Sequence, residues 1–96
     1  MRKAEVIRRI KEHEDEITAF KTKALYLCGS TVRDEAEPTS DIDVFIDPAP
    51  GFTFVELVGL EDRLSEILGA KADLATRGGL HPTLRQRIEA AAERII

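Results

Sequence analysis

Residues 41–46 read Asp-Ile-Asp-Val-Phe-Ile, and this stretch decides the fold of a chain of 96 residues. Acidic and apolar residues alternate at its start, which is the period of a β-strand with one face toward the core and the other toward solvent. Asp41 and Asp43 then share one face, roughly 7 Å apart at Cα. Acidic residues are depleted in strands and neighbouring like charges repel, so this pair favours a functional explanation over an ordinary solvent-facing sheet edge.

Outward from this strand, the spacing of apolar residues predicts the remaining elements. Thr53 and Glu56 form a capping-box pattern at a helix start, and Gly69 suits the left-handed position that ends a helix. The expected order is a helix over 3–20, strands over 24–28 and 41–46, a helix between 53 and 69, a strand over 71–76 and a last helix from Pro82 to the C-terminus. This order, α-β-β-α-β-α, predicts an α/β fold in which helices pack on a small mixed sheet.

Composition limits the class of protein. A chain of 10.7 kDa with 43% hydrophobic and 33% charged residues is expected to form one domain over residues 1–96. Its net charge of −4 argues against a general binder of nucleic-acid backbones, so no direct nucleic-acid binding is expected. No apolar run approaches a membrane span, and a lone cysteine forms no internal disulfide, so we expect a cytoplasmic protein without a membrane partner.

Three places in the sequence are candidates for binding a phosphate group or a metal ion. Gly29-Ser30 ends a buried apolar strand, where the backbone can approach a phosphate, although for this dipeptide taken alone an ordinary turn with a capping serine is the favoured interpretation. The carboxylates of Asp41 and Asp43 can reach one metal ion or a pair. Asp73 would join them only if its strand lies beside theirs, and otherwise it reads as a solvated residue. Cys28 is predicted to be a small core residue and not a nucleophile, because no histidine is near it in sequence.

Taken together, Gly29-Ser30, ten intervening residues and Asp41-Ile42-Asp43 resemble the G-S-x10-D-x-D signature of the minimal nucleotidyltransferases. These belong to the DNA polymerase beta-like nucleotidyltransferase superfamily. The resemblance extends through Asp73-Leu74 to the Leu80-His81-Pro82 stretch and covers about two thirds of the chain.

The resemblance implies a set of roles for these residues. Gly29 and Ser30 would hold the triphosphate of ATP, and the metal-binding and catalytic residues would be Asp41, Asp43 and Asp73. Two Mg²⁺ ions would be bound there, and an acceptor oxygen would attack the α-phosphorus with pyrophosphate leaving. Asp73 is the positional candidate to accept the proton of the acceptor.

Stand-alone domains of this size are similar to the antitoxin half of HEPN/MNT toxin–antitoxin pairs. That similarity implies AMP transfer from ATP to a tyrosine of a HEPN ribonuclease toxin, which is neutralised. Two alternatives stay open: an antitoxin that acts by binding alone, and a nucleotidyltransferase for small molecules. Asp34 and Glu37 make the loop after the Gly-Ser turn more acidic than in many relatives, which keeps the first alternative open.

Overall fold

A four-stranded mixed sheet forms the centre of the protein, seen in a computed structural model that describes residues 2–28, 41–79 and 82–96, without the side chains of 83–85 and 87. Spatially the strands are ordered β3-β2-β1-β4. β1 pairs antiparallel with both β2 and β4, whereas β2 and β3 are parallel. The strands are β1 (Thr22–Leu27), β2 (Ile42–Pro48), β3 (Ala72–Thr76) and β4 (Glu93–Arg94).

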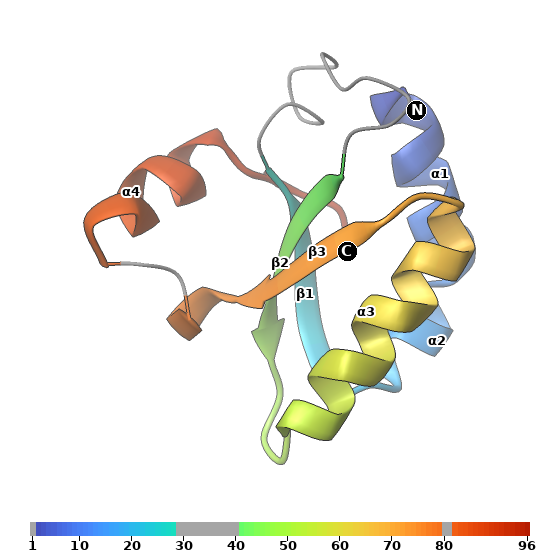
Figure 1. Cartoon of the computed structure of the whole chain (residues 1–96), viewed down its shortest axis with the longest axis horizontal. Coiled ribbons are helices and arrows are strands. Elements are labelled where there is room, and N and C mark those ends of the chain that lie inside the picture. The colour runs from blue at the N-terminus through green and yellow to red at the C-terminus, as the bar shows by residue number, and fades with distance from the viewer. Residues whose placement is uncertain (1, 29–40, 80–81) are drawn as a thin grey trace.

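Helices lie on both sides of this sheet (Figure 1). One side carries α1 (Lys3–Glu12), α2 (Glu14–Thr18) and α3 (Phe54–Leu68), and the other carries α4 (Pro82–Ala91). A short 3-10 turn, η2 (Arg77–Gly79), lies between β3 and α4 in the chain. The predicted α/β architecture of helices on a small mixed sheet is therefore confirmed.

The hydrophobic core lies between the sheet and the first three helices. Val6 and Ile10 of α1 and Leu60 and Leu64 of α3 are fully buried against the strands. The strands contribute the residues that point to this side, namely Leu25, Leu27, Ile42, Val44, Ile46 and Ala72. Alternation along β2 therefore turns its aliphatic residues toward the core and its acidic residues away from it.

Both predicted ends of α3 are confirmed. The backbone N–H of Thr53 donates to Glu56 Oε2 at 2.8 Å, and the Thr53 hydroxyl donates to the same carboxylate oxygen. At the other end Gly69 has φ 67°, a left-handed conformation that glycine adopts without steric cost. Local sequence thus fixes the start and the end of the helix that precedes β3.

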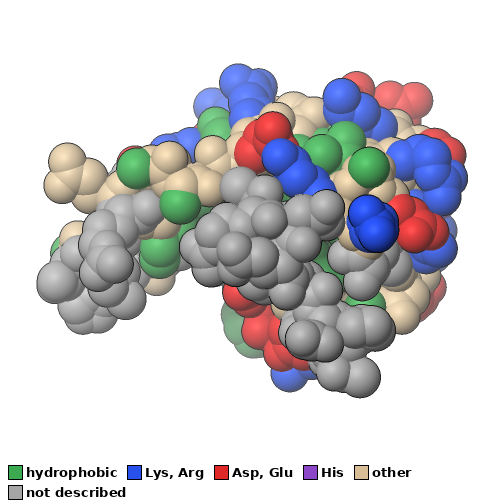
Figure 2. Space-filling model, turned by 90° about the horizontal axis from the view of Figure 1, so that it is seen from above, with side chains coloured by type: hydrophobic (Ala, Val, Ile, Leu, Met, Phe, Trp, Pro, Cys, Tyr) green, Lys and Arg blue, Asp and Glu red, His purple; other side chains and the backbone are tan. Residues whose placement is uncertain are grey.

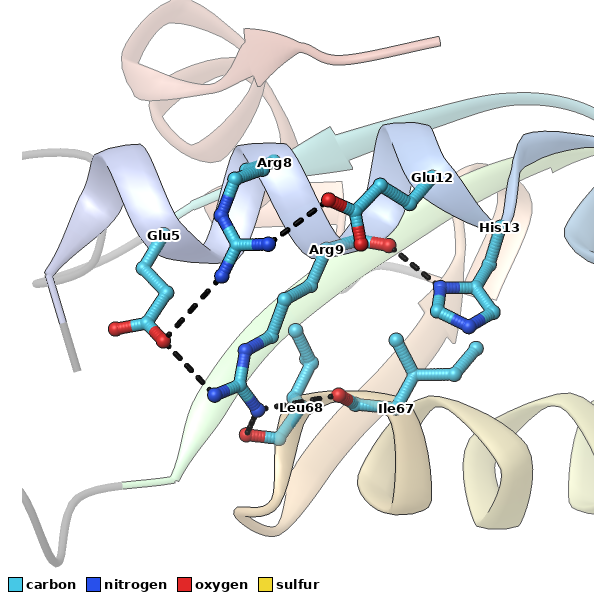
Figure 3. Close-up of polar contacts among 7 residues, drawn as sticks. All are labelled: Glu5, Arg8, Arg9, Glu12, His13, Ile67 and Leu68. Carbon is cyan, nitrogen blue, oxygen red and sulfur yellow. Dashed lines mark hydrogen bonds and ion pairs between the residues drawn. The ribbon is translucent and has the colours of Figure 1, made fainter.

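The single helix predicted over 3–20 is wrong, because it breaks at His13 into α1 and α2. His13 has φ −114° and ψ 22°, and its backbone N–H donates to Ile10 O instead of to Arg9 O. Instead, Nδ1 of the His13 imidazole is hydrogen-bonded to the carbonyl oxygen of Arg9 at 2.8 Å, as Figure 3 shows. A side chain that bonds to a helix carbonyl in this way competes with the backbone hydrogen bond and favours a break in the helix.

The prediction that the last helix runs to the C-terminus is also wrong. α4 ends at Ala91, and β4 pairs with the end of β1 through Tyr26 and Leu27. Ile95 is buried, as its spacing suggested, but in an extended segment whose N–H donates to Leu25 O at 2.8 Å. Pairing with the otherwise open edge of β1 outweighs helix propensity here, because it satisfies backbone groups of both segments.

Candidate active site

The structure brings two of the predicted site residues together across neighbouring strands. Asp43 of β2 lies directly opposite Asp73 of β3 in the parallel register. Both side chains are exposed, while the flanking Ile42, Val44 and Ala72 are buried, so the two carboxylates face away from the core. The condition on which the role of Asp73 depended, that its strand lies beside the strand of Asp43, is therefore met, and neighbouring strands are spaced about 4.8 Å apart.

Asp41 lies next to this pair. It precedes β2, is exposed, and follows the alternation that places it on the same face as Asp43. Its carboxylate lies 3.8 Å from Lys71 Nζ, whereas no described residue forms an ion pair with Asp43. Acidic and basic side chains are interspersed over the described residues of the face shown in Figure 2. The three aspartates are thus a local concentration of negative charge on a surface of mixed charge.

The electrostatics of the site act most strongly on Asp43. Burial raises the pKa of this carboxyl, and the negative charges of Asp73 and then Asp41 raise it further. Each of these effects disfavours the ionised form of Asp43. A bound cation between these carboxylates would offset the repulsion, which is the electrostatic condition under which divalent metals bind protein carboxylates.

Carboxylates of this kind suit Mg²⁺, which prefers oxygen ligands and keeps several positions for water and phosphate. Within residues 2–28, 41–79 and 82–96, no three acidic, histidine or cysteine side chains converge closely enough to hold an ion by themselves. Asp43 and Asp73 lie in register and could supply two ligands, and phosphate oxygens of a bound nucleotide are the usual source of others. The donor set therefore fits a metal that binds together with a nucleotide.

Gly29 and Ser30 lie outside the described residues, as do Asp34 and Glu37. The chain that leads to them leaves the sheet beside Asp43, since Cys28 N donates to Asp43 O at 3.1 Å.

Burial, followed by the charge of Asp43, raises the pKa of the Cys28 thiol to about 11. A thiol that stays protonated is a poor nucleophile, which agrees with the prediction that Cys28 is not a nucleophile. The prediction that Cys28 is a core residue is wrong, because its side chain is only half-buried at the end of β1.

Residues 5–96 match the family described as the nucleotidyltransferase domain. The chain belongs to this family. A Methanocaldococcus jannaschii relative inferred to be a protein adenylyltransferase, MJ1217, is 39% identical over 71 residues, which are 73% of this chain and 72% of the relative. This nucleotidyltransferase domain also superposes on a solved structure inferred to be a minimal nucleotidyltransferase, with a TM-score of 0.87 and 25% identity over 97% of this chain and 95% of the other.

The fold is also that of a toxin–antitoxin structure, the tri-AMPylated Shewanella oneidensis HEPN toxin in complex with MNT antitoxin. That likeness has a TM-score of 0.61 at 20% identity and covers 90% of this chain and 71% of the other. The predicted nucleotidyltransferase fold and the resemblance to minimal nucleotidyltransferases are confirmed by these comparisons.

Sequence reasoning missed a second polar cluster of this nucleotidyltransferase domain, at the far end of the same sheet face. Arg77 donates through Nε and Nη2 to Asp47 at 2.5 and 3.1 Å, and its guanidinium lies 4.9 Å from the ring centroid of Tyr26. Tyr26 and Phe45 stack at 4.7 Å beneath it. Asp47 and Arg77 border a cavity of about 530 Å³. Asp47 continues the acidic alternation of β2, but no pattern in the sequence connects it with Arg77.

Helices that could cross a membrane are not found among the described residues.

Proposed function

We propose that this protein is a Mg²⁺-dependent protein adenylyltransferase of the antitoxin type, which transfers AMP from ATP to a tyrosine of a HEPN ribonuclease in the cytoplasm. The observation that carries the proposal is the register of β2 and β3, which holds Asp43 opposite Asp73 on an exposed face with Asp41 beside them. Membership of the nucleotidyltransferase family supports the reaction type. The relatives inferred to be protein adenylyltransferases support a protein acceptor.

The proposed reaction is an in-line displacement at the α-phosphorus of ATP. The tyrosine hydroxyl oxygen forms the new bond to phosphorus, the bond to the β-phosphate oxygen breaks, and pyrophosphate leaves. Asp73 accepts the phenolic proton, because its side chain is exposed and because the edge strand β3 places it opposite Asp43. Asp41, Asp43 and Asp73 would hold the metal together with phosphate oxygens of ATP, and Gly29 and Ser30 would hold the triphosphate.

Mg²⁺, when bound, neutralises charge that develops on the attacking and leaving oxygens. The aspartates can serve this purpose only when ionised. Because burial and the neighbouring charges raise the pKa of Asp43, ion binding is expected to weaken as the pH falls into the titration range of this carboxyl. The protein contributes the fixed spacing of the carboxylates, which requires no rearrangement during the reaction.

The direct test is transfer of label from ATP carrying the label on its α-phosphate. The protein is incubated with Mg²⁺, labelled ATP and the HEPN protein encoded beside it, in parallel with the Asp41→Asn/Asp43→Asn variant. Asp62→Asn is the matched control, because Asp62 is an exposed acid on α3 away from the site. Label on a tyrosine of the HEPN protein, present with Asp62→Asn and absent with the double variant, would support the proposal.

Two other outcomes would contradict the proposal in different ways. A stable complex without label would identify an antitoxin that acts by binding alone. Label on a soluble compound instead of the protein would identify a nucleotidyltransferase for small molecules. Mass spectrometry of the HEPN protein identifies the modified residue and counts the AMP groups.

A further inference from the structure

The strand that carries Asp73 lies at the edge of the sheet. β3 is only five residues long, and within the described part of the chain β2 is its single neighbour in the sheet order. Short edge strands fray, because one side of their backbone lacks the partners that a neighbouring strand supplies. Here the fraying tendency is increased, since Asp43 and Asp73 are like charges directly opposite each other.

The backbone of β3 divides its hydrogen bonds between its two sides. Ile42 N donates to Lys71 O at 2.9 Å, so the odd-numbered residues of this segment present their backbone groups to β2. Backbone direction alternates along a strand, and the amides of Ala72 and Leu74 therefore point to the open edge. These are the two amides that flank Asp73.

Side chains of α3 accept both of these edge amides. Leu74 N donates to Glu61 Oε2 at 3.0 Å, and Ala72 N donates to Ser65 Oγ at 3.0 Å. Ser65 in turn donates its hydroxyl proton to the carbonyl oxygen of Glu61 at 3.0 Å. The two acceptors are four residues apart, so they lie on one face of the helix with about one turn between them.

The helix that holds these acceptors is itself firmly placed. Leu60, Leu64 and Leu68 are fully buried, Thr53 and Glu56 close one end of α3, and Gly69 ends the other. Glu61 and Ser65 are partly buried beside this packed face. The α3 side chains therefore fix the open edge of β3 to the core of the protein on either side of Asp73.

We propose that Glu61 and Ser65 are positioning residues, which hold the edge strand in place so that Asp73 stays beside Asp43. They do not touch the reacting atoms, because they bind the backbone of β3 from the side opposite β2. The inference rests on the proposed function for its catalytic consequence. The hydrogen bonds from the β3 backbone to Glu61 and Ser65, called the clamp below, can be tested without an activity assay.

The first test measures amide hydrogen exchange by NMR in Glu61→Ala, Glu61→Gln and Asp62→Ala. Glu61→Ala removes the acceptor, and the Leu74 amide is expected to exchange about tenfold faster or more. Gln keeps a side-chain oxygen at the same length and should restore most of the protection. Asp62→Ala removes the same charge from the neighbouring exposed position and should change nothing at Leu74. Equal exchange in all three variants would overturn the clamp.

The second test measures what the clamp does for the site. Mn²⁺ replaces Mg²⁺, and its binding in the presence of a non-hydrolysable ATP analogue is followed by electron paramagnetic resonance. Glu61→Ala should weaken Mn²⁺ binding by about tenfold, and Glu61→Gln should weaken it little. In the labelling assay Glu61→Ala should lower kcat while the KM for the HEPN protein stays unchanged.

The outcomes separate this inference from the proposed function. Unchanged Mn²⁺ binding and kcat in Glu61→Ala, with faster exchange at Leu74, would overturn the positioning role. Absence of AMP transfer by the unaltered protein would contradict the proposed function, while the exchange and Mn²⁺ results would still decide the clamp. A melting temperature measured for each variant ensures that only folded protein is compared, and Ser65→Ala provides a second variant if Glu61→Ala does not fold.

Discussion

Replacing Arg9 by alanine should destabilise the protein, because it removes hydrogen bonds to the C-terminal end of α3. Arg9 Nη1 donates to the carbonyl oxygens of Leu68 and Ile67 at 3.1 and 3.3 Å, and Nη2 forms an ion pair with Glu5 at 2.8 Å (Figure 3). The two carbonyls belong to the last turn of α3, where no backbone donor of the helix is available. Arg9 therefore joins α1 to the turn that leads into β3.

The size of the effect follows from these contacts. A hydrogen bond from a charged donor contributes about 1.5–3 kcal/mol when buried. The Arg9 side chain is 32% exposed, so water replaces part of what is lost, and we expect Arg9→Ala to lower the free energy of unfolding by about 2 kcal/mol in total. For a domain of this size that corresponds to a melting temperature lower by about 8–16 °C.

Arg8 provides the matched control. It is the next residue of α1, its side chain is 56% exposed, and it forms ion pairs with Glu12 and Glu5 at 2.8 and 3.6 Å within its own helix. Such pairs contribute about 0.5 kcal/mol or less, so Arg8→Ala should be nearly neutral. Urea denaturation followed by circular dichroism measures both variants. Equal destabilisation by the two variants would refute the assignment of the effect to the α3 carbonyls.

Three further predictions concern ionisable groups. The pKa of Glu56 is held at about 2, chiefly by the hydrogen bond from Thr53, so the ionised carboxylate stabilises the protein above pH 4.5 and this contribution is lost as the pH falls toward about 2. The difference in unfolding free energy between the unaltered protein and Glu56→Gln, measured in urea, should therefore shrink over that pH range. A difference that stays constant would contradict this prediction. Arg77 lowers the pKa of Asp47, so Arg77→Ala should raise it toward 3.8 in an NMR titration, whereas an unchanged value would show that the ion pair is absent in solution. With a pKa of about 11, the Cys28 thiol should react with a disulfide reagent at pH 8 about a hundredfold more slowly than free cysteine, and equal rates would disprove this.

The alternation at Asp41 and Asp43 predicted both the strand and the exposed face of its acids. This worked because the side-chain period of a strand is a local property, and because burial of Ile42 and Val44 leaves the acids only one side to face. The ends of α3 were equally predictable. Their signals, the capping pair and the left-handed glycine, act within four residues of the helix end.

Local patterns in the chain therefore predicted most of the helices and strands and the residue types of the candidate site. They did not predict that Asp73 lies opposite Asp43, that residues 93–94 form a strand beside β1, or that Arg77 binds Asp47, all of which depend on the folded protein. Each of these joins segments that are distant in the chain. The free energy of such a contact depends on which backbone edges and charges remain unsatisfied after the elements have packed, and neither periodicity nor propensity carries that information.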